Sequence, residues 1–358
     1  MKILLIRLRL IGDVVFTTPL IPALKQAFPG SRIAYLVERE SAAVVRGNPH
    51  LDDVIVVERT RGVRRVMDDL RLARRLRSAH YDVVLDLHGG PRSAWLAYTT
   101  RAPQRIGYDI SGRTWMYTRT VHRPRELRPR HSVSNQWDLL RAIEGWPGGV
   151  ADPDANPVEM PLDPSVDARI AEELRAAGVQ ASDELIVVHV SAGNPFRRWP
   201  EEAFTRLVAS LAANGDRRRL ILSSGPSDRG AAQRITAAAR AELGSERASR
   251  IVEFGDFGLK ELRSLVERSR LFVGGDTGPM HIAATTQTPI VVNYGPTLPA
   301  RSAPWRPRSL PTEAVETMGL PCRPCDQRVC EPGDFRCLTL IAPEDVVSAA
   351  ERVLRRSQ

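Results

Sequence analysis

The chain has 358 residues, long enough for two domains that each bury a core of their own. Hydrophobic residues make up 42% of it and charged residues 26%, the balance of a soluble globular protein, and no run approaches the ~20 apolar residues that a membrane span needs. The 51 basic and 42 acidic residues leave a net charge of +9, which favours nucleic acid, anionic lipid or acidic substrates as partners. Because Arg7 and Arg9 interrupt the first apolar run, we expect no signal peptide and a cytoplasmic protein.

The N-terminal segment predicts a strand followed by a helix. Residues 2–8 form a compact apolar run, short enough for a buried parallel strand, and a helical pattern starts at Asp13 and continues to Phe28. Asp13 is therefore expected at the carboxyl end of a strand and the start of a helix, the edge where open α/β sheets bind ligands. An aspartate that only caps the helix would occupy the same position.

Further strands are expected at residues 33–37, 54–57 and 83–87, alternating with helices, which predicts a doubly wound parallel sheet. The helix expected at residues 62–79 has an apolar face and an arginine-rich face, and we expect the arginines to be solvated. The apolar positions at helical spacing are Val63, Val66, Met67, Leu70, Ala73 and Leu76.

Residues 145–164 are rich in proline and glycine and are the best candidate for a domain linker. We place a first domain at residues 1–160, a second at 161–340 and a C-terminal helix within 341–358. Asp152 and Asp154 spell a metal-binding DxD pattern, but in a proline-rich linker we give it no weight. A leaving diphosphate would then need cations supplied by the protein.

Residues 271–286 predict a strand, a glycine-bearing loop and a helix, a unit that can hold a phosphate. Asp276 in this loop is placed to accept hydrogen bonds from sugar hydroxyls, although spacing alone fits an ordinary capped helix equally well. A second loop, residues 191–194, follows the strand expected at 185–190 and leads directly to Arg197. We expect it to cradle a diphosphate.

All four cysteines lie between Cys322 and Cys337. Four thiolates could hold zinc or an iron–sulfur cluster, although zinc sites usually show two paired CxxC knuckles. Reduced thiols in a structured loop, or a labile disulfide, fit the same pattern. A structural metal at this cluster is a hypothesis only.

Several stretches resemble glycosyltransferase family 9, the lipopolysaccharide heptosyltransferases. GGDTGPMHIAA resembles the family's donor-site loop, MKILLIRLRLIGDVVFTTPLIPALKQAFP its N-terminus, and RRWP a KRWP-like segment. LPCRPCDQRVCEPGDFRCL is most similar to the tail of the heptosyltransferase II branch. The resemblance implies an α/β protein of the GT-B type, with two Rossmann-like doubly wound domains facing a central cleft. The C-terminal helix would pack back toward the first domain.

The resemblance also implies roles for individual residues. Asp13 matches the family's proposed catalytic base, and the helix start at Arg61, Arg64 and Arg65 would meet an anionic acceptor. Either Ser227 or Asp228 would approach the ribose, a choice that we leave open. The family usually has lysine where Arg197 stands, so the charge is kept but the hydrogen-bond geometry differs. The residues expected around the donor are Ser191, Arg197, Asp276, Thr277, Gly278, Met280 and His281.

The implied reaction is inverting transfer of heptose from ADP-heptose to a Kdo or heptose residue of the lipopolysaccharide inner core, with no cofactor required. Another ADP-sugar or acceptor, or a non-catalytic nucleotide-sugar-binding protein, remains an alternative. Nucleic acid is not expected as a partner, because the arginines lack interleaved aromatic residues and no recognised motif occurs. The positive charge alone suggests peripheral contact with the cytoplasmic face of the inner membrane.

Overall fold

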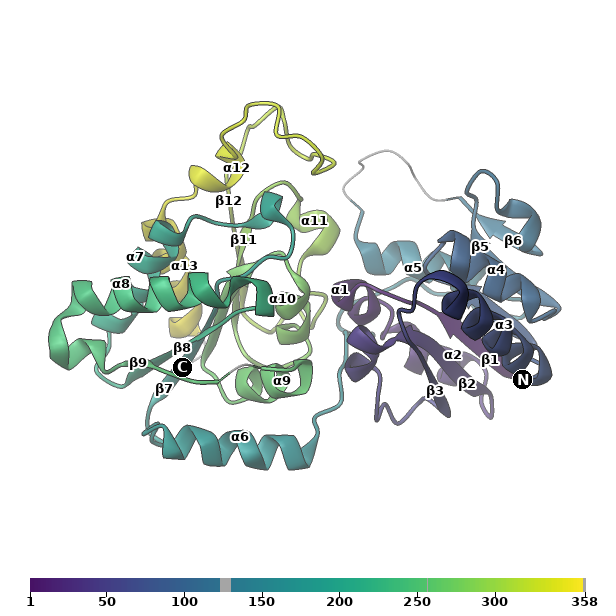
Figure 1. Ribbon diagram of the computed structural model, residues 1–358, viewed down its shortest axis with the longest axis horizontal. Helices are drawn as coiled ribbons and strands as arrows, with labels where there is room; N and C mark the ends of the chain where they lie inside the picture. Colours follow the sequence, from purple (N-terminus) through teal and green to yellow (C-terminus); the bar gives the residue numbers. More distant parts are fainter. Residues whose placement is uncertain (123–129, 256, 357–358) are drawn as a thin grey trace. The chain divides into compact units, whose positions relative to one another are not determined.

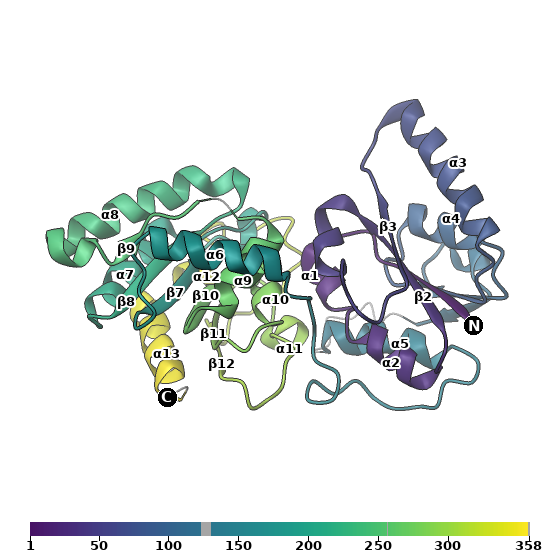
Figure 2. The same cartoon turned by 90° about the horizontal axis from the view of Figure 1, so that it is seen from below.

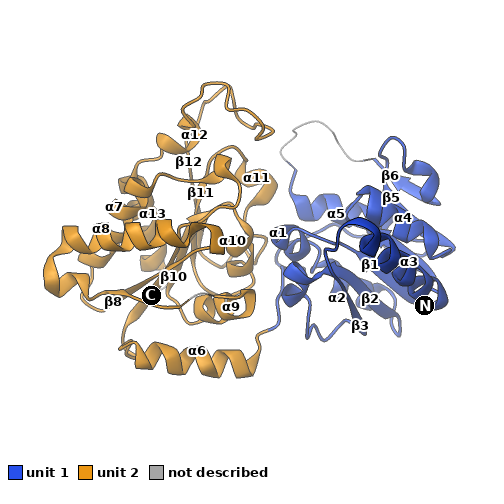
Figure 3. Ribbon diagram, in the orientation of Figure 1, with its two compact units in different colours: residues 1–161 blue, residues 162–358 orange. Residues whose placement is uncertain are grey.

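A computed structural model describes residues 1–122, 130–255 and 257–356. The chain divides into two compact units, Met1–Pro161 and Leu162–Gln358 (Figures 1 and 3). In the part of the chain described, no helix combines the length and apolar character needed to cross a bilayer.

Unit 1 is built on a six-stranded parallel sheet with the strand order β3-β2-β1-β4-β5-β6. The central strand β1 is apolar, and its residues from Ile3 to Ile6 are fully buried, as expected for a strand with helices on both faces. The strands are β1 (Lys2–Ile6), β2 (Arg32–Glu38), β3 (Asp53–Val57), β4 (Val83–Asp86), β5 (Gln104–Tyr108) and β6 (Arg119–Val121).

The helix expected from Asp13 to Phe28 is two helices in the structure. The first begins before Asp13, and the second starts after Pro19, which cannot donate a backbone hydrogen bond. The hydroxyls of Thr17 and Thr18 bond back to the carbonyls of Val14 and Val15 in the break. The helical segments of unit 1 are α1 (Ile11–Val15), α2 (Leu20–Ala27), η1 (Arg39–Val44), α3 (Gly62–Ser78), α4 (Pro91–Thr99), η2 (Thr114–Met116) and α5 (Ser132–Arg141).

Helix α3 differs from the two-faced helix that the sequence predicts. Of its six apolar positions, Ala73 and Leu76 are buried, whereas the four in the first half are exposed. The core of unit 1 closes against the second half of the helix, where Leu72 also packs. The buried side is therefore not the side that the apolar spacing indicates.

Unit 2 repeats the plan with a six-stranded parallel sheet in the order β12-β11-β10-β7-β8-β9. Its strands are β7 (Glu184–His189), β8 (Arg218–Ser223), β9 (Ile251–Val252), β10 (Leu271–Gly275), β11 (Ile290–Tyr294) and β12 (Thr312–Glu316). Its helical segments are α6 (Pro164–Ala176), η3 (Pro195–Arg197), α7 (Glu201–Ala213), η4 (Pro226–Asp228), α8 (Arg229–Ala248), α9 (Leu259–Glu267), α10 (Gly278–Ala283), α11 (Pro299–Ser302), α12 (Arg336–Thr339) and α13 (Pro343–Arg356).

The C-terminal helix α13 belongs to the core of unit 2. Its packing toward the first domain, which the family resemblance implies, stays a prediction. Val346, Ala350 and Val353 lie on its apolar face and are fully buried in the same cluster as α7 and β11 side chains. Glu351 on the same helix accepts two hydrogen bonds from Arg218 of β8, at 2.6 and 2.8 Å.

Both sheets reverse their strand order at one point, between β1 and β4 in unit 1 and between β7 and β10 in unit 2. The predicted class of two doubly wound parallel sheets is confirmed. In such sheets, ligands bind beyond the carboxyl ends of the two strands that flank the reversal. The loops after these four strands are therefore where a site is expected.

Candidate active site

In unit 2, two loops meet at the reversal point of the sheet. One follows β7 and contains Ser191 and η3, and the other follows β10 and contains Asp276 and the start of α10. The two loops pass close to each other at Gly275. A Cβ atom added to this glycine would lie 3.6 Å from the carbonyl oxygen of Arg197. The sequence predicted both loops as parts of one donor site, and the topology brings them to the same edge.

Arg197, which lies in the loop after β7, is held by Asp276 and Gln327 and still reaches solvent. Its Nη1 donates to the carbonyl oxygen of Asp276 at 2.8 Å and lies 3.4 Å from the Asp276 Oδ2. Its Nε donates to the Oε1 of Gln327 at 2.8 Å. The side chain is 29% exposed, and its Nη2 has no partner among the described residues. The guanidinium therefore offers a positive charge and one open donor group at the strand ends.

Asp276 is buried and turned into the protein. Its Oδ2 accepts hydrogen bonds from Thr297 Oγ1 at 2.5 Å and Ser302 Oγ at 3.1 Å, and the Nε2 of His281 lies 3.5 Å from its Oδ1. Burial raises the pKa of Asp276, but the interaction with His281 and the charge of Arg197 outweigh it and bring the pKa down to about 2. The carboxylate is thus ionised and orients Arg197. Its contact with sugar hydroxyls stays a prediction.

The loop after β10 becomes helical at Gly278. Thr277 is the N-cap residue, and the first helical hydrogen bond runs from the amide of Met280 to the carbonyl oxygen of Thr277 at 3.1 Å. The amides of Thr277 and Gly278 precede that bond. Met280 is fully buried and His281 nearly so, so their side chains stabilise the loop from within. The expected position of Met280 around the donor stays a prediction.

Ser191 belongs to a second polar cluster that joins the loops after β7 and β8. Its hydroxyl donates to Asp228 Oδ2 at 2.5 Å, and the Nη2 of Arg198 lies 3.0 Å from the Oδ1 of the same carboxylate. Asp228 is buried, whereas Ser227 is exposed. Of the two residues considered for the ribose, Asp228 is therefore occupied with holding the loops together.

Gln327 is a site residue that the sequence did not indicate. It lies in the cysteine-bearing segment, and its Oε1 accepts hydrogen bonds from Asn194 Nδ2 and Arg197 Nε, both at 2.8 Å. The segment is tied to the site elsewhere, because Arg323 donates to the carbonyl oxygen of Thr297 at 2.8 Å. A left-handed backbone conformation at Gln327, with φ of 59°, turns its side chain toward η3. A local sequence pattern cannot predict a contact between residues that are 130 positions apart in the sequence.

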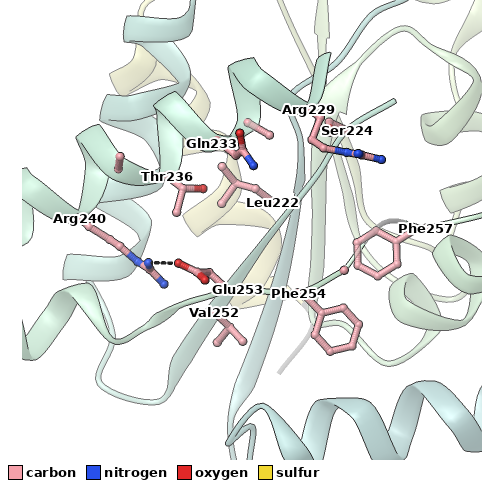
Figure 4. A pocket seen from close by; sticks show the side chains of 13 residues that line it. Leu222, Ser224, Arg229, Gln233, Thr236, Arg240, Val252, Glu253, Phe254 and Phe257 are labelled. Atoms are coloured by element: carbon pink, nitrogen blue, oxygen red, sulfur yellow. Dashed lines mark hydrogen bonds and ion pairs between the residues drawn. The ribbon is translucent and has the colours of Figure 1, made fainter. Parts of the chain in front are cut away.

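A cavity of about 400 Å³ lies beside these loops, at the carboxyl ends of β8 and β9 (Figure 4). Phe254 and Phe257 are stacked on one side of it, with ring centroids 5.4 Å apart and planes inclined by 17°. The ion pair of Arg240 with Glu253 closes another part of its wall. The side chains drawn in the figure also include Leu222, Ser224, Arg229, Gln233, Thr236 and Val252.

In unit 1, Asp13 lies at the corresponding point, in the first turn of α1 after β1. Its side chain is 37% exposed and forms an ion pair with Arg7, which is almost fully buried. The Nη1 of Arg7 also donates to the carbonyl oxygen of Leu87 at 2.5 Å, just after β4. Arg7 thus links the two strands of the reversal and fixes the orientation of the Asp13 carboxylate.

The turn after β4 is held by Asp86, whose carboxylate accepts hydrogen bonds from the amides of His88 and Gly89 at 3.0 and 2.9 Å. Ser93 and Tyr117 donate to the other oxygen at 2.9 and 2.7 Å. Burial and the charges of Arg7 and nearby Arg9 lower the pKa of His88 to about 4, so His88 is neutral near pH 7. Because His88 is neutral, the positive charge beside this turn comes from Arg7 and Arg9.

The predicted acceptor residues Arg61, Arg64 and Arg65 are all exposed, at or near the start of α3. Arg65 lies 3.8 Å from Asp69, while Arg61 and Arg64 form no ion pair with any described residue. The helix itself is fastened by Arg92 of α4, which pairs with Asp69 at 2.7 Å and Glu38 at 3.3 Å. These guanidiniums are open to an anionic ligand.

The cysteine segment gives no support for a metal centre. All four thiols are free, and burial raises the pKa of Cys337. Within the ranges that the structure covers, no three His, Cys, Asp or Glu side chains lie close enough to hold an ion.

Two doubly wound parallel sheets with polar loops at each reversal point define an α/β protein of two Rossmann-like units. The sequence profile of "Glycosyltransferase family 9 (heptosyltransferase)" matches residues 69–334. The chain therefore belongs to glycosyltransferase family 9 and is a glycosyltransferase.

Three relatives illustrate the similarity. The lipopolysaccharide heptosyltransferase 3 of Escherichia coli K12 is 25% identical over 96% of this chain and 95% of its own length. A family 9 glycosyl transferase from Veillonella parvula superposes with a TM-score of 0.83 at 24% identity, covering 99% of this chain and 97% of the other. An E. coli heptosyltransferase solved with ADP, and also with ADP-2-deoxy-2-fluoro heptose, superposes with TM-scores of 0.69 and 0.68 at 19% identity over the whole of both chains. The two structural matches have the same GT-B type of fold.

Proposed function

We propose that this enzyme transfers heptose from ADP-heptose to a Kdo or heptose residue of the lipopolysaccharide inner core, with inversion at the anomeric carbon. Membership of the heptosyltransferase family supports the sugar. The binding of ADP and an ADP-heptose analogue by a relative of the same fold supports the donor. The observation that carries the proposal is Arg197, a partly exposed guanidinium fixed at the reversal point of unit 2.

The diphosphate of the donor would lie between the loop after β7 and the start of α10. Its negative charge would face the open Nη2 of Arg197 and the amides of Thr277 and Gly278, which precede the first helical hydrogen bond. Asp276 would hold Arg197 in place and not touch the phosphates, because like charges repel. A protein cation would thus neutralise the leaving ADP, so the reaction needs no metal ion.

The nucleoside would extend from the diphosphate toward β8 and β9. Strands β8 and β9 lie next to β7 in the sheet, and the cavity of Figure 4 lies at their carboxyl ends. Stacked Phe254 and Phe257 offer an aromatic surface for an adenine ring, and exposed Ser227 remains the candidate for the ribose hydroxyls.

Asp13 would act as the general base on the acceptor. The acceptor oxygen forms a bond to the anomeric carbon, the bond from that carbon to the diphosphate oxygen breaks, and ADP leaves with the electron pair. The proton of the acceptor hydroxyl passes to Asp13. The ion pair with Arg7 keeps the carboxylate oriented for this transfer. Arg61, Arg64 and Arg65 would bind the anionic groups of the acceptor.

Calorimetry without added metal tests the donor assignment. We expect ADP-heptose and ADP to bind, and UDP-sugars and NAD not to bind. If ADP-heptose and ADP both fail to bind, the donor site proposed here is wrong. If ADP binds but a different ADP-sugar is transferred, the nucleotide site stands and the heptose assignment fails.

A further inference from the structure

Helix α3 carries an exposed apolar stripe. Among the described residues, the stripe does not belong to the hydrophobic core of unit 1. The stripe consists of Val63, Val66, Met67 and Leu70, which are 77, 58, 49 and 44% exposed. Their spacing of three and four residues places them on one face of the helix. In Figure 2 the first turns of α3 extend past α4, away from the sheet of unit 1.

The stripe is not the side of α3 that packs against the core of unit 1. Helix α3 packs on unit 1 through Leu72, Ala73 and Leu76, which lie on a different side of the helix. That packing side is also fastened by the ion pair of Asp69 with Arg92. Scattered exposed apolar residues are ordinary, but four on one helix face mark an interaction surface.

Within α3, arginines flank the stripe. Arg74 and Arg77 follow Leu70 on the same face by helical spacing, and Arg64 and Arg71 run along its flank. Arg64, Arg74 and Arg77 form no ion pair with any described residue. The two acidic residues of the helix are engaged, Asp68 with Arg71 at 3.3 Å and Asp69 with Arg92 at 2.7 Å. The outward side of α3 is therefore apolar and positive.

We propose that α3 docks this enzyme on an anionic lipid bilayer, with the stripe in the interface and the arginines on lipid phosphates. An amphipathic helix with basic and aliphatic residues binds such a surface through both effects together. A second copy of the chain is a poorer occupant, because two such faces would bring arginines against arginines. Nucleic acid would use the arginines but leave the stripe in water.

This inference rests on the proposed function in one respect, since an acceptor of the lipopolysaccharide type is anchored in a bilayer. The same helix would then meet the membrane with its stripe and the acceptor with Arg61 and Arg64 at its start. Docking itself requires neither donor nor acceptor, so it can be tested apart from transfer.

The test is co-sedimentation of the full-length protein with vesicles of phosphatidylglycerol and phosphatidylethanolamine, and with vesicles of phosphatidylcholine alone. We expect binding to the anionic vesicles only. The double variant V66D/L70D should weaken that binding at least about tenfold, because it removes apolar contact and adds two negative charges to the interface. V150D is the matched control, since Val150 is 68% exposed and lies outside α3, and it should bind like the wild type.

Transfer to a water-soluble acceptor saccharide separates the two proposals. V66D/L70D should retain that activity and the wild-type thermal midpoint, because the changed side chains are exposed. Absence of transfer by the wild type would count against the proposed function and leave docking to be judged by the vesicles alone. Docking is overturned if the wild type does not bind anionic vesicles, or if V66D/L70D binds them as well as V150D does. Self-association of the wild type that V66D/L70D abolishes, without vesicle binding, would assign the stripe to a second copy.

Discussion

At the scale of single residues, Arg197 shows how the candidate site holds a positive charge in a fixed position. It has a carbonyl, a carboxylate and an amide as partners within the protein, from Asp276 and Gln327. These partners fix the guanidinium before any ligand arrives, so it need not reorganise when charge develops on a leaving diphosphate. Preorganised charge of this kind is usually a large part of catalysis.

Replacing Arg197 with alanine should lower kcat by about 10²-fold, because one charged donor to the leaving group is lost. Lysine at the same position should restore much of the rate, since it keeps the charge. Arg328 is a suitable control, because it is exposed, follows Gln327 directly, and among the described residues pairs only with Asp326, at 3.4 Å. Steady-state kinetics with ADP-heptose compare the three variants. Equal activity of R197A and R328A would remove Arg197 from the donor site.

At the scale of elements, α13 is attached to the sheet of unit 2 by apolar packing and by the paired hydrogen bonds of Arg218 with Glu351. These hydrogen bonds lower the pKa of Glu351 in the folded protein. The contribution is therefore present above the unfolded pKa, about 4.3 for a glutamate, and is lost as the pH falls through the lower folded value.

The variant E351Q should lose about 1–3 kcal/mol of unfolding free energy at pH 7 relative to the wild type. The difference should shrink when both proteins are acidified through the folded pKa of Glu351, which lies below its usual range, because the wild-type carboxylate is then protonated. Urea unfolding at the two pH values measures this. Glu344, exposed in the first turn of the same helix, gives the control E344Q, which should lose less than about 1 kcal/mol. A pH-independent loss in E351Q would contradict the ion-pair explanation.

The sequence predicts where strands and helices lie better than it predicts which side of a helix is buried. Compact apolar runs such as residues 2–8 and 271–273 predict buried strands because both faces of a doubly wound sheet are covered. The break before Pro19 was missed, although proline is a known interruption, because the apolar spacing continues across it. For α3, spacing indicates one apolar face but cannot say which side the rest of the chain covers. Tertiary packing decides that.

At the scale of the whole molecule, topology explains how much of the candidate site could be predicted from the sequence. The sequence places Ser191, Arg197 and Asp276 after strands, and the order of the sheet brings those strand ends together. The sequence does not show that Asp276 bonds to Thr297 and Ser302 inside the protein. Nor does it show that Gln327, from a distant loop, accepts a hydrogen bond from Arg197. Both depend on contacts between segments that no local pattern records.

The proposed mechanism depends most on Asp13 as the base, and the variant D13N tests this role directly. Asparagine has nearly the same shape but cannot accept the proton, so transfer should fall by about 10²–10⁴-fold. Calorimetry on the same sample should show unchanged binding of ADP, because the proposed donor site lies in loops of unit 2. Loss of transfer with normal ADP binding is the result we predict. Transfer at a near-normal rate by D13N would contradict the assignment of Asp13 as the base, and with it the mechanism proposed here.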